Sequence, residues 1–347
     1  MFLTKPYVTP RGLLTGAPAR DAVRGGRALA LGKDLAFTAV ELTDSTLSPT
    51  VQQTFLVKEC PSASQPWLTA YAHAPETFAG LSLAAPLLMG VVNVTPDSFS
   101  DGGQFSAPTY AIAHGRALME AGASIIDVGG ESTRPGAAPV EVSEEIGRVV
   151  PVVRALANLG ICVSIDTRHA AVMEAAISAG ARIVNDVTAL AGEGALAVVA
   201  KAKVAAILMH MQGEPRTMQD HPSYTWAPGD VFDFLEARLK ACMAAGIARE
   251  RLAVDPGIGF GKNDVHNAQI LDHTALYRAL KCPVVIGASR KSFIGRMSRG
   301  EDARHRLPGS LAAGLHGVFQ GAQILRVHDV AETRQALAVA GRINFGG

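Results

Sequence analysis

The sequence predicts an α/β protein whose main part is a (β/α)8 barrel. From about residue 86 onward, short runs rich in Val, Ile and Leu alternate with Ala-rich amphipathic stretches, as in βα units around a parallel sheet. Eight such runs can be counted, and eight βα units over residues 86–347 match the roughly 250 residues typical of this barrel. A doubly wound open sheet is the alternative architecture.

The eight candidate strands follow one another at regular intervals. In chain order they are 86–94 (PLLMGVVNV), 123–130 (ASIIDVGG), 161–167 (ICVSIDT), 182–187 (RIVNDV), 205–210 (AAILMH), 251–257 (RLAVDPG), 283–289 (PVVIGAS) and 323–329 (QILRVHD). The clearest candidate helices between them are 109–122, 144–160, 169–180 and 229–246. These helices end in Gly, a residue that commonly terminates helices.

Residues 1–85 have a different character. Only 27–45 (RALALGKDLAFTAVELTDS) and 50–60 (TVQQTFLVKEC) show weak strand character, and the remainder is rich in Pro, Ala, Ser and Thr. We therefore expect two parts: a small β-containing extension of unknown role over 1–85, and the barrel over 86–347.

Composition favours a cytoplasmic enzyme. A chain of 347 residues with 48% hydrophobic residues can bury an enzyme-sized core. Its net charge of +1, from 32 basic and 31 acidic residues, makes nucleic acid an unexpected partner. The four cysteines lack CxxC spacing, which suggests reduced thiols. We find neither a secretion signal nor an apolar stretch of about 18 residues, and therefore expect no membrane association.

Polar residues occupy the ends of all eight candidate strands. They are Asn93, Asp127, Asp166, Asn185, Asp186, His210, Asp255, Ser289, Arg326 and His328. In a barrel these ends converge on the C-terminal rim, where barrel enzymes keep their active sites. The pattern predicts a shared polar site, with ordinary turn chemistry as the alternative.

Three segments favour an anionic ligand at this rim. The loop 127–138 (DVGGESTRPGAA) combines glycines, hydroxyls and Arg134, a chemistry that suits phosphate. The segment 287–295 (GASRKSFIG) places Lys291 at an expected helix start, where free N–H groups favour an anion. A solvated basic helix start is the alternative interpretation of this segment. Arg326 and His328 lie two residues apart on a strand and so share one face.

The acidic strand ends suit a different part of a ligand. Asp166, Asn185 and Asp255 could surround a flat ring rich in hydrogen-bond donors, because a carboxylate can accept two N–H bonds from an aminopyrimidinone edge. Ion pairing with Lys291 or capping of strand ends is the alternative. The spacing of these carboxylates gives no specific sign of a metal site.

Eight ordered segments carry a resemblance to a known family. They are MGVVNVTPDSFSDGG, GASIIDVGGESTRPGA, SIDT, VNDV, LMHMQGEPRTMQ, DPGIGFGK, IGASRKSFIG and LRVHDV, spread over residues 86–345. Together they resemble dihydropteroate synthase, the folate-pathway family targeted by sulfonamides. The resemblance implies a (β/α)8 barrel, usually a homodimer. It also implies transfer of the pterin methylene of 6-hydroxymethyl-7,8-dihydropterin diphosphate to 4-aminobenzoate, with release of pyrophosphate.

The resemblance also implies roles for individual residues. The pterin would be held by Asp166, Asn185, Asp255 and Lys291, with Met209 and Phe260 lining its pocket. The diphosphate would be held by Thr133, Arg134, Arg326 and His328, and Mg2+ by Asn93. The aminobenzoate would meet Ser292, Phe99 and Pro135, under a first loop that contains Asp97 and Asp101.

The implied mechanism depends on charge. Arg326, His328, Lys291 and Asp255 are the expected catalytic residues. The C–O bond ionises to give a pterin cation, and cationic groups stabilise the departing pyrophosphate. No general base is assigned. A pterin-dependent methyltransferase and a catalytically silent pterin-binding homologue are the alternatives, and the basic segments favour the diphosphate substrate.

Overall fold

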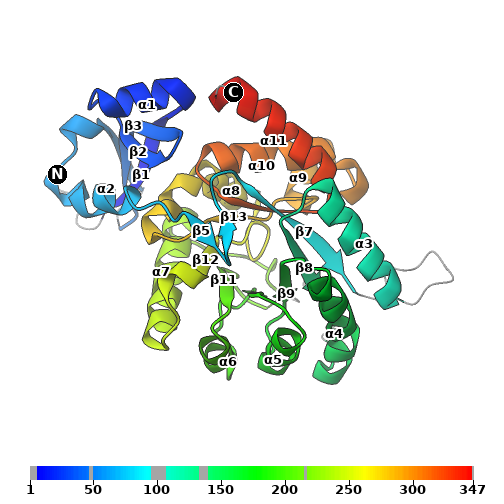
Figure 1. Cartoon of the computed structure of the whole chain (residues 1–347). Helices are drawn as coiled ribbons and strands as arrows, with labels where there is room; N and C mark the ends of the chain where they lie inside the picture. The colour runs from blue at the N-terminus through cyan, green and yellow to red at the C-terminus, as the bar shows by residue number, and fades with distance from the viewer. Residues whose placement is uncertain (1–5, 47–49, 95–106, 133–139, 215–216, 346–347) are drawn as a thin grey trace.

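The computed structural model of the chain describes residues 6–46, 50–94, 107–132, 140–214 and 217–345. Its strands form an eight-stranded parallel sheet, a four-stranded antiparallel sheet and a two-stranded hairpin. Figure 1 shows the four-stranded sheet at the N-terminal end, beside the helices that surround the larger sheet.

The eight parallel strands form the predicted barrel. They are β7 (Leu87–Asn93), β8 (Ile125–Gly129), β9 (Val163–Asp166), β10 (Ile183–Asp186), β11 (Ala205–Met209), β12 (Leu252–Asp255), β13 (Val285–Ile286) and β14 (Ile324–Val327). Their order is β12-β11-β10-β9-β8-β7-β14-β13. A parallel bridge between Val254 and Val284 joins the two ends of this order, which closes the sheet. The (β/α)8 architecture is therefore confirmed, and the open sheet is not.

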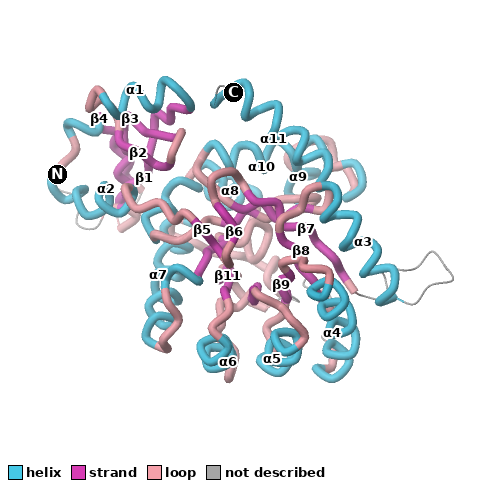
Figure 2. The backbone as a smooth tube through the Cα atoms, viewed as in Figure 1, coloured by secondary structure: helices cyan, strands magenta, loops and turns pink. Residues whose placement is uncertain are grey.

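Helices surround the barrel (Figure 2). They are α3 (Ala107–Ala121), α4 (Val142–Asn158), α5 (Ala170–Ser178), α6 (Ala195–Ala202), α7 (Ala227–Ala244), α8 (Asp264–Asp272), α9 (Ser292–Arg296), α10 (Leu307–Phe319) and α11 (Val330–Phe345). The 3-10 helices η4 (Arg249–Arg251), η5 (Thr274–Leu280) and η6 (Ala303–His305) lie in the connections. No described helix is both long enough and apolar enough to cross a membrane.

Apolar side chains from the beginnings of the strands fill the amino-terminal end of the barrel. Met89, Ile125, Ile183 and Ile324 are fully buried there and belong to one cluster with Phe78. Phe78 lies in the hairpin of β5 (Thr77–Phe78) and β6 (Leu81–Ser82), which plugs this end. The opposite end is left for polar side chains.

The N-terminal sheet is built around β3. Its elements are β1 (Tyr7–Thr15), α1 (Gly16–Arg24), β2 (Leu29–Gly32), β3 (Leu35–Asp44), β4 (Val51–Leu56), η1 (Val57–Glu59), η2 (Ser62–Ser64) and α2 (Gln65–Tyr71). β3 pairs antiparallel with β1, β2 and β4. The two stretches expected to have strand character contain β2, β3 and β4, whereas β1, α1 and α2 were not expected.

This sheet is attached to the side of the barrel by polar contacts. The Tyr7 hydroxyl donates to Asp233 on α7 at 2.8 Å. Arg11 pairs with Asp272 at the end of α8 at 2.9 Å. Glu41 lies 2.9 Å from His273 Nε2, and ionic and hydrogen-bond contacts with Arg11 and His273 lower the pKa of Glu41 to about 2 against the opposing effect of its burial. These contacts involve the outer helices and leave the strand ends free.

Candidate active site

Polar side chains gather at the carboxyl ends of the barrel strands, as the sequence predicts. Asp166 ends β9 and lies opposite Asn185 of β10 in the strand register. Asp255 ends β12 and lies opposite Met209, the last residue of β11. Arg326 is the third residue of β14. Each side chain is held on a strand of the closed sheet, so the backbone fixes its position.

Arg326 is the centre of this constellation. Its Nε donates to Asp127 Oδ2 at 2.6 Å, and its Nη2 donates to Asp166 Oδ2 at 2.7 Å. Asn185 Nδ2 donates to the same Asp127 oxygen at 3.2 Å. One guanidinium therefore connects two carboxylates from neighbouring strands, and an amide completes the network.

The network has unusual electrostatics because it is buried. Burial raises the pKa of Asp166 to about 7, although Arg326 opposes this rise. The carboxylates around Arg326 raise its own pKa against the effect of burial. Lys291 has its pKa lowered to about 7, first by burial and then by repulsion from Arg326. Groups with such displaced pKa values in a shared site are characteristic of active sites.

Asp255 also lies close to Arg326. Its Oδ1 accepts a hydrogen bond from the Gly257 amide at 2.7 Å, and burial raises its pKa. A Cβ added at Gly287 would lie 3.7 Å from both Asp255 Oδ2 and Arg326 Cβ. The Asp255 carboxylate and the Arg326 side chain thus both pack against Gly287, where a larger residue would contact both of them.

The aromatic ring of Phe260 lies against Lys291 in the site. Lys291 Nζ lies 3.8 Å from the centroid of the Phe260 ring, which is a cation–π contact. The backbone turns sharply here, since Gly259 has φ +82° and an added Cβ would lie 3.1 Å from Lys291 Cδ. Met209 is buried in the adjoining strand. The structure therefore brings Phe260 and Lys291 together, as expected of two residues that line one pocket.

A fully buried lysine lies beneath this loop. Lys262 Nζ is 2.9 Å from His210 Nδ1 and donates to the Phe260 carbonyl at 3.0 Å. Burial lowers the pKa of Lys262 well below its usual range and lowers that of His210 to about 2. Gly257 has φ +70°, and a Cβ added there would lie 1.9 Å from the His210 carbonyl oxygen. The loops after β11 and β12 are therefore locked together.

His328 and the residues after β13 form the remaining edge of the site. His328 Nδ1 lies 3.0 Å from Ser289 Oγ, which also accepts from the His328 amide at 3.2 Å. Arg290 does not face the network, because its Nε donates to Asp329 at 2.9 Å. Ser292 is exposed at the start of α9, where its Oγ accepts from Arg296 at 2.9 Å.

Asn93 lies at the carboxyl end of the first barrel strand, beside Gly129 and Asp166. It is the last residue of β7, and its Oδ1 lies 3.7 Å from the position of a Cβ on Gly129 of β8, as close as Asp166 Cβ does. An amide oxygen is a hard ligand of the kind Mg2+ accepts, and Mg2+ characteristically takes few protein ligands beside substrate phosphates and water. The donor chemistry of Asn93 is therefore compatible with the expected ion.

Six expected site residues lie outside the described part of the chain. They are Asp97, Phe99, Asp101, Thr133, Arg134 and Pro135. Three residues that were assigned no ligand from the sequence prove to be part of the site or its support: Asp127, His210 and Lys262. Asp127 and His210 were expected at the shared polar site because each ends an apolar run, but their partners were not predicted. Nothing in the glycine-rich segment around Lys262 signals a buried lysine.

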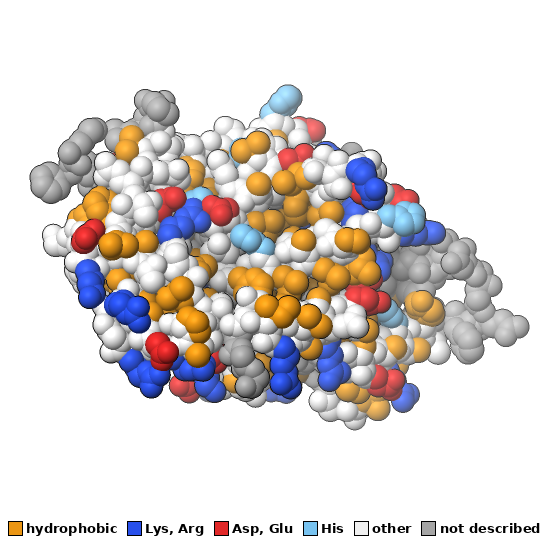
Figure 3. Space-filling model, turned by 90° about the horizontal axis from the view of Figure 1, so that it is seen from above, with side chains coloured by type: hydrophobic (Ala, Val, Ile, Leu, Met, Phe, Trp, Pro, Cys, Tyr) orange, Lys and Arg blue, Asp and Glu red, His pale blue; other side chains and the backbone are white. Residues whose placement is uncertain are grey.

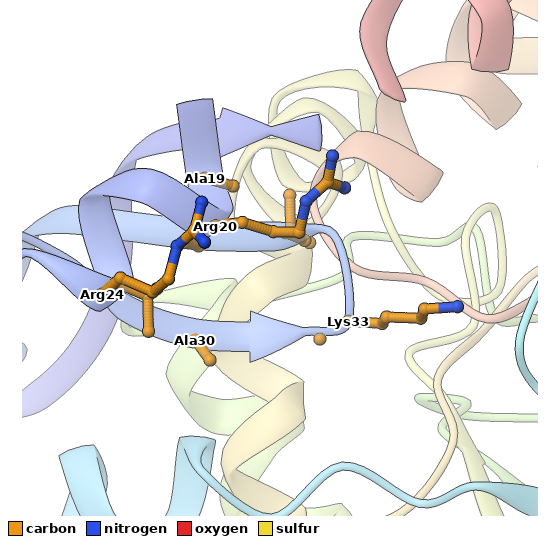
Figure 4. Close-up of a pocket in the computed structure, with 9 residues that line it drawn as sticks. Ala19, Arg20, Arg24, Ala30 and Lys33 are labelled. Atoms are coloured by element: carbon orange, nitrogen blue, oxygen red, sulfur yellow. The ribbon is translucent and has the colours of Figure 1, made fainter. Parts of the chain in front are cut away.

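A separate hollow lies in the N-terminal sheet (Figure 4). Its volume is about 330 Å³, and it is lined by Ala19, Arg20, Val23, Arg24, Ala30, Gly32, Lys33, Leu35 and Ala36. Arg20 and Arg24 are already paired with Asp34 and Asp21. The lining offers no carboxylate, imidazole or thiol, so the hollow is a poor candidate for catalysis.

Known proteins resemble about three quarters of this chain. A family model described as pterin binding enzyme matches residues 89–328. Dihydropteroate synthase of Escherichia coli K12 is 46% identical over 260 residues, which are 75% of this chain and 92% of that protein. The Neisseria meningitidis serogroup B enzyme of the same name is 47% identical over 265 residues, with 75% and 93% covered.

Solved structures agree with the sequence relatives. The dihydropteroate synthase of Xanthomonas albilineans with 4-aminobenzoic acid superimposes with a TM-score of 0.73 at 47% identity, covering 76% of this chain and 96% of that one. The same enzyme in complex with 7,8-dihydropteroate gives a TM-score of 0.69 at 43% identity, covering 76% and 95%. The chain belongs to the dihydropteroate synthase family of pterin binding enzymes.

Proposed function

We propose that the chain condenses 6-hydroxymethyl-7,8-dihydropterin diphosphate with 4-aminobenzoate to give 7,8-dihydropteroate and pyrophosphate. The observation that carries this proposal is the buried network in which Arg326 joins Asp127 and Asp166 at 2.6 and 2.7 Å. A guanidinium and carboxylate acceptors lie side by side there, at the carboxyl end of the barrel. A substrate with a donor-rich ring at one end and a diphosphate at the other matches both kinds of group.

The pterin ring would occupy the acceptor side of the site. Its aminopyrimidinone edge presents N–H donors, and Asp255 Oδ2 is the carboxylate oxygen not engaged by the Gly257 amide. Asn185 and Asp166 would meet the rest of the ring, beside Met209. Lys291 would lie at the ring edge, because its ammonium already rests on the Phe260 ring at 3.8 Å.

The diphosphate would lie toward β14, β13 and the loop after β8. In the reaction the bond from the pterin methylene carbon to the diphosphate oxygen breaks, and its electron pair leaves with pyrophosphate. The aminobenzoate nitrogen forms the new bond to that carbon and loses a proton. Arg326 and His328, with Thr133 and Arg134, would stabilise the negative charge that develops on the leaving group.

The ion and the second substrate complete the proposal. Mg2+ held by Asn93 and the diphosphate would neutralise leaving-group charge when bound. The aminobenzoate carboxylate would meet Ser292, an exposed residue at the start of α9. Phe99 and Pro135 would border its ring, and Asp97 and Asp101 belong to the segment we propose to close over it.

We also propose a cytoplasmic homodimer. Two apolar residues four positions apart on α11 support an apolar contact face, because Val339 is 56% exposed and Ile343 is 76% exposed. Figure 3 shows apolar side chains spread across the middle of the face seen from above. Light scattering after gel filtration measures the molar mass in solution. We expect twice the mass of one chain, and the mass of a single chain would contradict the dimer. The four free thiols suit a reducing compartment, and cell fractionation would test that location.

Product formation tests the proposed reaction. The purified full chain, given both substrates and Mg2+, should form 7,8-dihydropteroate that chromatography and mass spectrometry detect. Asp255→Asn should lower kcat/KM by about a hundredfold or more, because it removes a buried charge from the site. Asp21→Asn, on the surface of the N-terminal sheet, is the matched control and should leave the rate unchanged. A wild-type chain that binds the pterin but makes no product would contradict the proposal.

A further inference from the structure

Three potential metal ligands face one another beside the active site, outside the groups used in the proposed reaction. They are Glu131, just after β8, Glu145 in the first turn of α4, and His169, just after β9. Their ligand atoms all lie within 4.8 Å of one another. His169 Nε2 is 3.8 Å from Glu131 Oε2 and 4.0 Å from Glu145 Oε2.

Glu145 is buried without the hydrogen bonds that a buried carboxylate normally has among its described neighbours. Its side chain is 0% exposed, and neither carboxylate oxygen has a hydrogen-bond partner of good geometry among the described residues. His169 Nε2 is likewise buried and unpartnered among them. An unpaired buried carboxylate is costly to a folded protein, so buried polar groups of this kind need an explanation. Both unpartnered groups point into the same gap.

We propose that Glu131, Glu145 and His169 form a binding site for a divalent transition-metal ion, with Zn2+ as the preferred ion. Ligand atoms that share a Zn2+ lie about 3.4 Å apart, because each is about 2.1 Å from the ion. The two observed gaps to His169 would need to close by only about 0.5 Å. One imidazole with two carboxylates suits Zn2+ or a similar ion, whereas Mg2+ and Ca2+ prefer oxygen ligands alone.

The charges around the cluster leave room for a cation. Arg168 holds Glu131 at 3.2 Å from its Nε and also pairs with Glu214 at 3.4 Å. Arg148, the other nearby cation, pairs with Glu144. Among the described residues, Glu145 therefore forms no ion pair with a lysine or an arginine. Burial raises the pKa of Glu145 to about 7, because the Thr167 hydroxyl and the charges of Arg168 and Arg148 offset the effect of burial only in part and the charge of Glu131 adds to it.

The position of the site gives it a structural consequence. Glu131 Oε1 also accepts from the Val140 amide at 3.2 Å, so this carboxylate ties together the two ends of the segment 131–140. An ion shared with α4 and with the start of α5 would anchor that connection to two helices. Thr133 and Arg134 lie within the same segment. The metal site itself does not depend on the proposed reaction.

Neighbouring glutamates provide a matched pair of variants. The full chain, without a polyhistidine tag and freed of metal by chelation, would be titrated calorimetrically with Zn2+ near pH 8. Wild type and Glu144→Gln should bind one ion per chain at this site, because the Glu144 side chain is 56% exposed and paired with Arg148. Glu145→Gln and His169→Asn should each weaken that binding by roughly a hundredfold or more.

Thermal unfolding provides a second readout and controls for misfolding. Zn2+ at a hundredfold excess over Kd should raise the Tm of wild type and Glu144→Gln by roughly 5 °C. Glu145→Gln should show no such rise, yet its Tm in chelator should equal or exceed that of wild type, because an unpaired buried charge has been removed. Equal Zn2+ binding by Glu145→Gln and wild type, or no binding by wild type, would overturn the proposal.

Discussion

Arg326→Met removes the guanidinium that donates hydrogen bonds to both Asp127 and Asp166. The two carboxylates are 0% and 13% exposed, so water cannot replace the guanidinium effectively. Methionine keeps most of the side-chain volume, which limits the effect of an empty space. The variant therefore measures the electrostatic role of Arg326 in the folded protein, separately from any role in catalysis.

The expected loss of stability depends on pH. Removing one partner of a buried ion pair costs about 3–5 kcal/mol. The pKa of Asp166 is already about 7 in the folded chain, above its ordinary value of 3.8, so its contribution to stability is present at low pH and is lost as pH rises through 7. Without Arg326 this pKa rises further. Each added unit contributes about 1.4 kcal/mol of extra destabilisation at high pH.

Urea unfolding at pH 6 and pH 9 measures both effects. Arg326→Met should lose more stability at pH 9 than at pH 6, and adding Asp127→Asn should recover part of the loss by removing one buried charge. Arg296→Met is the surface control, since Arg296 pairs at 2.6 Å with an Asp264 side chain that is 36% exposed. Its cost should stay below about 1 kcal/mol at either pH. An equal loss for Arg326→Met at both pH values would refute this reasoning.

Three further predictions follow from named contacts. Gly257→Ala should lower the free energy of unfolding, measured in urea, by more than about 3 kcal/mol, because the added Cβ would lie 1.9 Å from the His210 carbonyl oxygen. Gly160→Ala is the control and should lower it by about 1 kcal/mol, because Gly160 also has a positive φ (+78°) but no neighbour within 4 Å. Because the pKa of Lys291 is about 7, kcat/KM should fall as pH rises above 7, and Lys291→Arg, which stays protonated, should remove that fall; an unchanged profile would contradict the role of Lys291. Asn93→Ala should raise the Mg2+ concentration needed for half-maximal rate roughly tenfold, and an unchanged Mg2+ titration would exclude Asn93 as a ligand.

The barrel could be predicted because its strands are short apolar runs with polar ends. All eight observed strands lie inside the expected ranges, from β7 to β14. The same pattern located Asp166, Asn185, Asp255 and Arg326 at one end of the sheet, since parallel strands place their carboxyl ends together. Periodicity thus determined both the architecture and the position of these side chains.

The first strand could not be predicted because its sequence resembles a loop. β1 contains Pro10, Arg11 and Gly12, and Gly12 has φ +60° and interrupts the regular pairing with β3. The side chain of Thr38 donates to the Gly12 carbonyl at 3.1 Å, a contact that only the folded sheet supplies. Propensity disfavours this strand, and tertiary pairing overrides it.

The partners of individual polar residues also required three-dimensional information. Arg326 was expected to hold a diphosphate, and in the structure two of its nitrogens hold Asp127 and Asp166. Lys262 is buried against a histidine 52 positions away in the chain. Neither pairing has a local sequence signature, because each joins residues that are distant along the chain. Arg326 on β14 reaches past β7 to Asp127 on β8 and Asp166 on β9, and Lys262 and His210 follow β12 and β11.

Pyrophosphate release by the purified chain tests the central claim most directly. The chain would be given the pterin diphosphate and Mg2+, with and without 4-aminobenzoate. We expect sustained release only when the aminobenzoate is present, with one 7,8-dihydropteroate formed for each pyrophosphate, and loss of both products in Arg326→Ala. Release that is unaffected by aminobenzoate, or tight pterin binding with no release at all, would contradict the assignment of this site to dihydropteroate synthesis.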